Sequence, residues 1–257
     1  MIVRALVLAV FAVGCSDPVH AADIVSHRAT YTLTFGGAQP SAGFTGATGT
    51  MEVELVAACD GFRSKQAMQL AMLTAGGPAT TTQFTGIIFE RMDGTQMTFE
   101  TTQSVAGQVE QSFKGTAVHP AGQPGSIRYE TPKGLTVPTP RDTLFPVEGS
   151  RRVLDAAAAG EAFLAANLFD GGGPDALSAV SVLIGTAEVG KGNFAGRPSW
   201  RVQIAHYPMN SAAATPEFEE GYRLYTGGIL DELDLNYGLF HLKGALSKLE
   251  LLPAPTC

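Results

Sequence analysis

Apolar and polar residues alternate along most of this chain, which is the pattern of strands with one buried face. The clearest case is residues 27–35, where every second side chain from Ala29 to Phe35 is apolar. Residues 50–58 repeat the pattern, and Asp60-Gly61 then supplies a hairpin turn, because this dipeptide tolerates positive φ. About thirteen strands are predicted in this way: 27–35, 50–58, 62–73, 82–92, 96–103, 108–118, 126–130, 163–169, 177–189, 199–207, 219–225, 229–236 and 239–251.

The middle of the chain departs from this alternation. Pro132, Pro138 and Pro140 predict an irregular connection, and the Ala-rich stretch after them predicts one helix over residues 146–159. Pro146 suits the first helical turn, where its missing N–H costs no hydrogen bond. An antiparallel meander of about 13–14 strands cannot stay flat, because strands twist and sheets beyond roughly ten strands curl or close. We therefore predict an all-β fold whose sheet curls into an open barrel, with the helix covering a concave face.

The amino terminus has the layout of a secretory signal peptide. Arg4 supplies the early positive charge, and residues 5–14 form an uninterrupted apolar run. That run is too short to span a bilayer and has the length of a signal h-region. A small-x-small triplet fits cleavage before Ala22. We predict a signal peptide over 1–21, a single domain over 22–257 and a periplasmic location.

A second processing route stays open. Residues 12–15 form a loose lipobox that would make Cys15 a lipid-anchored amino terminus. Such boxes usually carry Leu where this chain has Ala12, so the cut before Ala22 is favoured. No later stretch reaches the roughly 18 apolar residues that a membrane-spanning helix needs.

Either route leaves two cysteines, Cys59 and Cys257. An even count in an exported protein argues for one disulfide, which would tie the carboxyl end back to the first hairpin. The alternative is two buried free thiols.

Composition and charge exclude several classes of partner. The chain carries a net charge of −7, and its Lys and Arg residues are scattered. Without a basic stripe, a nucleic-acid interface is not expected, and an acidic surface gains nothing from anionic lipid headgroups. The 30 glycines fit short strands and tight turns better than a helical bundle.

Short segments spread over the whole chain resemble the cell-envelope integrity EipB family of alphaproteobacteria. In order, they are His27-Arg28-Ala29-Thr30-Tyr31, Cys59-Asp60-Gly61, Leu144-Phe145-Pro146, Phe169-Asp170-Gly171, Leu235-Asn236-Tyr237-Gly238 and Leu251-Leu252-Pro253 before Cys257. Two features depart from the family pattern: Ser199-Trp200-Arg201, where Trp is more often followed by Pro, and the lipobox-like Gly14-Cys15.

The resemblance implies a periplasmic β-spiral with a central helix and a disulfide equivalent to Cys59–Cys257. It also implies a role in cell-envelope integrity and stress resistance, without catalysis, and a periplasmic partner of the tetratricopeptide-repeat class.

Motifs of catalysis and metal binding are missing from the sequence. It has no Gly-x-Ser-x-Gly elbow, His-Glu-x-x-His pair, Walker loop or Cys-x-x-Cys. Residues 190–196 resemble a phosphate loop but have the wrong spacing, so we predict a hairpin turn. Residues 170–175 carry two carboxylates on a turn but lack the acids of a calcium loop. Neither a cofactor nor a metal is predicted.

The remaining polar and aromatic candidates are assigned to structure. The histidines lack metal-ligand spacing, and His27 is interpreted as a buried polar anchor. Glu232 and Asp234 share one strand face, with Asp231 opposite, which permits paired acid–base chemistry but is more typical of a solvated face. The other histidines are His119, His206 and His241, and the aromatic residues interpreted as core or turn residues are Trp200, Tyr207, Tyr222 and Tyr225.

We therefore predict a non-enzymatic periplasmic protein that supports the cell envelope by binding a protein partner or an envelope component. Its binding surface is expected on the concave face or on an exposed edge strand. The alternative is a carrier of lipid or lipoprotein, with a lipid or peptide as its ligand, and an envelope-modifying hydrolase is the third possibility.

Overall fold

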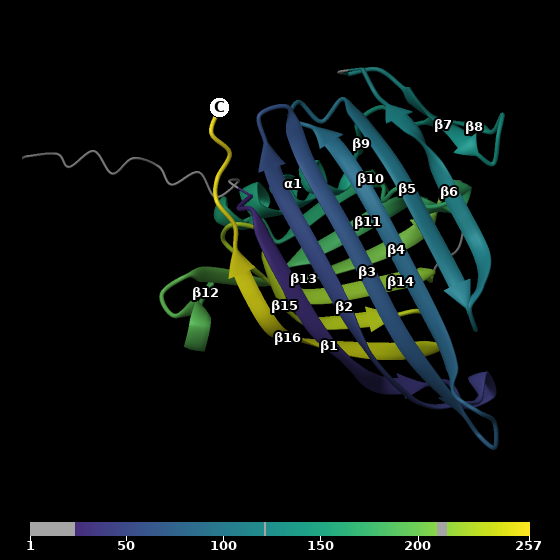
Figure 1. The fold of residues 1–257 in the computed structure, drawn as a ribbon. Coiled ribbons are helices and arrows are strands. Elements are labelled where there is room, and N and C mark those ends of the chain that lie inside the picture. Colours follow the sequence, from purple (N-terminus) through teal and green to yellow (C-terminus); the bar gives the residue numbers. More distant parts are fainter. Residues whose placement is uncertain (1–23, 121, 210–214) are drawn as a thin grey trace, which may run out of the picture.

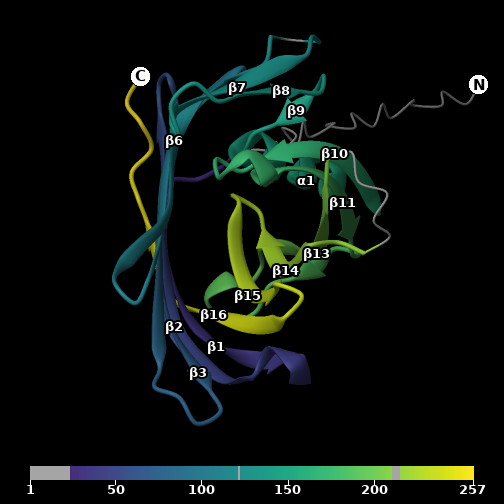
Figure 2. The ribbon, with the colours of Figure 1, turned by 90° about the vertical axis from the view of Figure 1, so that its right-hand side faces the viewer.

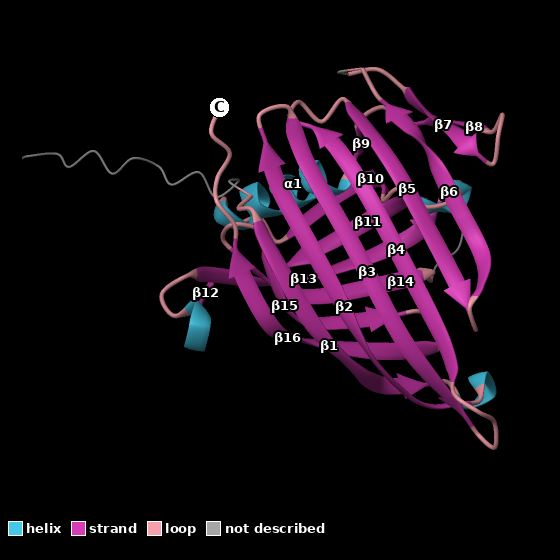
Figure 3. Ribbon diagram, in the orientation of Figure 1, coloured by secondary structure: helices cyan, strands magenta, loops and turns pink. Residues whose placement is uncertain are grey.

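The computed structural model describes residues 24–120, 122–209 and 215–257 (Figures 1 and 3). The predicted signal peptide over 1–21 and Cys15 lie outside the described residues. Within them the chain forms a 16-stranded sheet and one α-helix. The elements are β1 (His27–Ala38), β2 (Phe44–Ala58), β3 (Gly61–Thr74), β4 (Thr80–Arg91), β5 (Gln96–Val105), β6 (Gln108–Val118), β7 (Gly125–Thr131), β8 (Thr136–Thr139), β9 (Thr143–Leu144), α1 (Pro146–Ala158), β10 (Phe163–Phe169), β11 (Leu177–Ile184), β12 (Glu188–Val189), β13 (Pro198–Pro208), β14 (Phe218–Tyr225), β15 (Ile229–Asn236) and β16 (Phe240–Leu251).

The strands follow one continuous order, β8-β7-β6-β5-β4-β3-β2-β1-β16-β15-β14-β13-β11-β10-β9, with β12 added at β13. Strands β1 and β16 pair antiparallel, so the first and last strands lie side by side in the middle of the sheet. The exception to antiparallel pairing is the short contact between β9 and β10, which is parallel. The fold is all-β, as predicted. The sheet curls until it nearly closes into a barrel and leaves an unsealed seam between its two ends.

The two ends of the sheet overlap face to face. Phe169 at the end of β10 is fully buried, and its ring centroid lies 5.2 Å from that of Phe99 on β5. The hydroxyl of Tyr129 on β7 donates to the carbonyl of Gly172 at 3.2 Å. The tip of the β10–β11 hairpin is therefore tucked under the inner face of β5–β7, and the sheet is a spiral rather than a closed cylinder.

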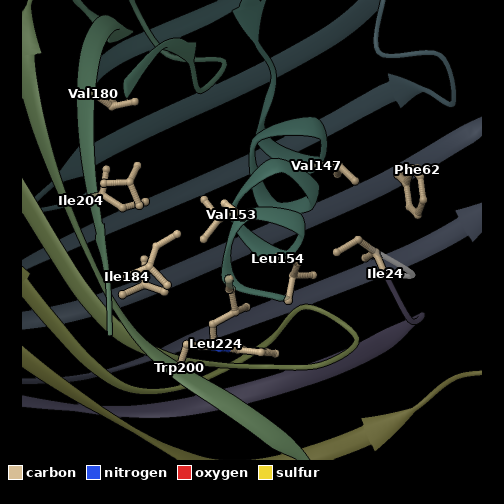
Figure 4. Packing of buried hydrophobic residues seen from close by; sticks show 14 residues of the cluster. Ile24, Phe62, Val147, Val153, Leu154, Val180, Ile184, Trp200, Ile204 and Leu224 are labelled. Carbon is tan, nitrogen blue, oxygen red and sulfur yellow. The ribbon is translucent and has the colours of Figure 1, made fainter. Parts of the chain in front are cut away.

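Helix α1 fills the inner side of this spiral (Figures 2 and 4). Its buried residues Val153 and Leu154 pack with Trp200 and Leu224 of β13 and β14 and with Phe62 of β3 in one apolar cluster. The helix occupies 146–158, which confirms the predicted position.

A buried carboxylate holds the amino terminus of this helix. Phe145 occupies the N-cap position and offers no side-chain cap. Instead Glu90 of β4, 2% exposed, accepts the N–H groups of Val147 and Glu148, each at 2.8 Å. Burial raises the pKa of Glu90 to about 7, although the two hydrogen bonds oppose this shift. One side chain therefore joins the sheet to the helix.

The Pro-rich connection is more regular than predicted. It contains β8 and β9, two short strands at the ends of the sheet, and Pro138 lies within β8. Proline is tolerated there because an end strand pairs on one side alone. The predicted strand 177–189 is broken after β11, and β2 begins at Phe44 rather than at residue 50.

Candidate functional site

Cys59 and Cys257 are joined by a disulfide in the structure, with their Cα atoms 5.6 Å apart. Cys59 lies in the turn between β2 and β3, and the extended tail after β16 reaches it. The bond spans a sequence separation of 198. It therefore attaches the carboxyl end to the hairpin that packs over α1.

An inward-facing polar relay crosses three neighbouring strands of the spiral. The Ser178 hydroxyl of β11 lies 3.2 Å from Nδ1 of His206 on β13, and Nε2 of His206 lies 3.4 Å from Oε1 of Glu220 on β14. Hydroxyl, imidazole and carboxylate in this order are the arrangement that activates a serine nucleophile. Ser178, however, is 7% exposed, so a substrate has little access to its oxygen.

The turn after β10 seals the overlap of the two sheet ends. The carbonyls of Gly171 and Gly172 accept hydrogen bonds from Thr101 and Tyr129. Asp170 accepts the Gly172 N–H at 2.9 Å, and desolvation raises the pKa of Asp170 against the opposing effects of that bond and of His206. These oxygens are already engaged, and no cluster of three His, Cys, Asp or Glu in the described part of the chain is placed to hold a metal.

A hollow of about 950 Å³ lies on the outer face of the sheet. We call it the outer groove; it crosses from β1 through β16, β15, β14 and β13 to β11. Gly221 lies in its floor, where the missing side chain deepens the surface. Leu183, 56% exposed, lies at its edge and pairs across the strands with Phe163, which is 55% exposed.

Ion pairs line the outer groove. Glu232 pairs with Arg201 at 2.7 Å and with Arg223 at 3.0 Å, while Asp234 pairs with Lys243. Desolvation would raise the pKa of Glu232, but the two arginines outweigh it and the pKa is lowered. Glu232 and Asp234 both face the groove, as their spacing predicts, yet both carboxylates are engaged by cations, which disfavours paired acid–base chemistry.

The other residues singled out in the sequence are dispersed. His27 is 4% exposed and its Nδ1 lies 2.8 Å from the Val25 carbonyl; desolvation lowers its pKa, which fits the interpretation as a buried anchor. Trp200 and Tyr225 are buried, and Tyr225 stacks on Phe194 with centroids 4.0 Å apart. Phe194 belongs to residues 190–196, which connect β12 to β13 as a hairpin turn.

Three functional candidates escaped the motif search: Ser178, Glu220 and Glu90. Each is a polar residue that falls in phase with the apolar face of its strand. Glu220 alternates with Tyr222 and Leu224, for example. A search for polar residues at core-facing positions could have found them.

Comparisons with known proteins agree with this architecture. Residues 18–253 match the family described as EipB-like. The chain is 27% identical to the cell envelope integrity protein EipB of Brucella abortus (strain 2308), over 93% of this chain and 88% of that protein. The crystal structure of a beta-barrel-like protein of the domain of unknown function DUF1849, also from Brucella abortus, matches with a TM-score of 0.83 and 26% identity, covering 90% of this chain and 99% of that one.

The name of this relative supports a role in envelope integrity and a location in the cell envelope, and a disulfide is consistent with an oxidising compartment. No helix in the described ranges is long and apolar enough to cross a membrane. Sequence and fold thus agree over most of the chain, and the chain belongs to the EipB-like family.

Proposed function

We propose that this protein supports the periplasmic side of the cell envelope by binding a protein partner, without catalysis, and that the outer groove is its binding surface. The observation that carries the proposal is the groove itself. Its volume of about 950 Å³ is at the upper end of the roughly 300–1,000 Å³ typical of ligand sites.

The character of the groove favours a polypeptide. Charges of both signs lie along it, and the exposed pair Phe163 and Leu183 offers an apolar anchor at one edge. Protein interfaces combine such an apolar anchor with a polar surround. The tetratricopeptide-repeat partner implied by the family resemblance is the first candidate to test.

The absence of catalysis is supported by the state of the polar side chains. Ser178 is buried, Glu232 and Asp234 in the groove are paired with Arg or Lys, and Glu219 accepts a hydrogen bond from Asn236. A general acid or base must lie within hydrogen-bond reach of the substrate. These side chains instead form hydrogen bonds or ion pairs with other residues of the protein.

The test fills the groove without disturbing the fold. In Gly221→Phe, a Cβ would meet its nearest neighbour, Cβ of Asp234, at 3.5 Å, so the ring can be accommodated toward the groove. The matched control is Thr98→Phe, which adds the same ring to an exposed position on β5. In a strain lacking the protein, we expect the control to restore resistance to detergent and cell-wall antibiotics and Gly221→Phe to fail, with equal melting temperatures. Full restoration by Gly221→Phe would overturn the assignment of the groove.

The lipid-carrier alternative makes a separate prediction. It requires that protein purified under native conditions carry lipid, which native mass spectrometry would detect as an added mass removed by organic solvent. If lipid is bound at equal occupancy in the wild type and in Gly221→Phe, the carrier function is located elsewhere than the groove.

A further inference from the structure

A second hollow, of about 510 Å³, lies at the seam where the two ends of the sheet meet. We call it the seam pocket. It is formed by residues 137–140 in and after β8, by the single turn of 3₁₀-helix Pro174–Ala176 with Leu177, and by residues 208, 209 and 217 at the facing ends of β13 and β14. It shares no lining residue with the outer groove.

The walls of the seam pocket are rigid and combine apolar and polar surface in nearly equal parts. Four of its lining residues are prolines: Pro138, Pro140, Pro174 and Pro208. Because proline fixes φ, these walls lose little conformational freedom when a ligand binds. A preformed pocket of this kind suits a ligand that combines an aliphatic part with polar groups.

A buried hydroxyl in the wall lacks a partner. Thr139 is 4% exposed and lines the pocket, and its Oγ1 has no hydrogen-bond partner among the described residues. Buried polar atoms are nearly always paired, because leaving one unpaired is costly. This oxygen itself is fully buried, so it lies behind the pocket wall and out of reach of a ligand.

The charge of the seam pocket has one sign. Asp175 and Glu217 line it, both are exposed, and neither forms a salt bridge within the described part of the chain. Among the residues that the structure describes, the lining contains no Lys, Arg or His. In a chain with a net charge of −7, this pocket attracts cations and repels anions.

We propose that the seam pocket binds a lysine-bearing segment of a partner polypeptide. The methylene stem of the lysine packs against the prolines, and its ammonium is held by Asp175 and Glu217. The proposal concerns a surface separate from the outer groove, so either can fail alone.

The probe is a fluorescently labelled, end-capped peptide, Ala-Leu-Lys-Leu-Ala, titrated with full-length mature protein at low salt. Its control replaces Lys by norleucine, which keeps the stem and removes the charge. We expect the lysine peptide to bind at least tenfold more tightly than the norleucine peptide, with the difference shrinking as salt rises.

Protein variants locate the site. Asp175→Asn with Glu217→Gln should abolish the tenfold preference for lysine. Thr139→Val, which keeps the shape of the side chain, is the control in the pocket wall: it should bind the lysine peptide as the wild type does, with a melting temperature unchanged or higher. Gly221→Phe in the outer groove should bind the peptide as the wild type does.

Three results would overturn the proposal: equal affinity for the two peptides, an unchanged lysine preference in the double carboxylate variant, or binding of dodecylamine with no binding of the peptide. The last would assign the pocket to a cationic lipid-like molecule instead.

Discussion

Glu90 allows the sharpest test of how this fold is held together. Its carboxylate is the cap of helix α1, supplied from a strand rather than from the residue before the helix. The variant Glu90→Gln keeps the size of the side chain and removes its titration. Stability measured against pH then isolates the contribution of one buried ionisable group.

The sign and size of the effect follow from the pKa of Glu90. It is raised by burial from 4.5 to about 7 in the folded protein. Below pH 4.5 the group is protonated in both the folded and the unfolded state. As pH rises from 4.5 to about 7 the unfolded chain loses the proton while the folded protein keeps it, so the wild type loses stability. At about 1.4 kcal/mol per pKa unit, the total loss is about 3 kcal/mol.

The assay is urea unfolding of the wild type and Glu90→Gln at half-unit steps from pH 4 to pH 8. The amide carries a fixed cost, since its NH₂ group cannot accept the second helix N–H. The free energy of unfolding of the variant should nevertheless gain about 3 kcal/mol relative to the wild type across this range. Glu110→Gln, at an exposed position on β6, is the control and should show a difference that does not change with pH. A pH-independent difference for Glu90→Gln, or one of opposite slope, would refute the assigned role of burial.

Two further changes test the disulfide and the relay. Cys59→Ser should lower the free energy of unfolding, by about 5 kcal/mol at most in the chain-entropy model for a loop of this length, as measured by unfolding without reductant; a variant as stable as the wild type would argue against a structural bond. Ser178→Ala should cost about 1 kcal/mol through one lost hydrogen bond, and wild-type protein should resist labelling by a fluorophosphonate. Labelling that disappears in Ser178→Ala would instead show a reactive serine.

Local pattern was enough to predict most of the strands and the helix. In β1, alternation from Ala29 to Leu33 assigns the buried face correctly, because a strand turns successive side chains to opposite sides. Pro146 predicted the start of the helix and the Ala-rich run predicted its extent. Both signals are local, so they can be recognised in the sequence alone.

The overlap of the sheet ends could not be predicted in this way. Phe169 and Leu177 are buried under β5–β7, although each lies on the opposite face of its strand from Leu168 and Ser178. Alternation tells which residues of one strand share a face, but not which distant strands cover that face. A strand that is packed on both faces has apolar residues on both faces, so its sequence no longer alternates. The overlap of the sheet ends is such a place.

The buried polar residues that form the helix cap and the relay were not predicted from the sequence, for a related reason. Glu90, Ser178 and Glu220 stand where the pattern calls for an apolar residue. Each is tolerated in the core because a residue of another element forms a hydrogen bond with it. That hydrogen-bond partner cannot be predicted until the register of the strands is known. His206 was noticed in the sequence, but its two partners were not.

The two ends of the spiral also decide which kind of surface a partner can use. Tyr129 N–H donates to the Leu135 carbonyl, which fixes the register of β8 on β7. In this register the backbone polar groups of every second residue of β8 point toward β7, and those of Thr136 and Pro138 point toward the free edge. Pro138 has no N–H to offer there, and β9 at the other end spans only Thr143–Leu144. Proline and short length are both devices that block the addition of a further strand. Strand addition, expected from the sequence as one binding mode, is therefore disfavoured at β8 and β9, and we expect a partner to use the hollows that the curled sheet leaves on its outer face and at its seam.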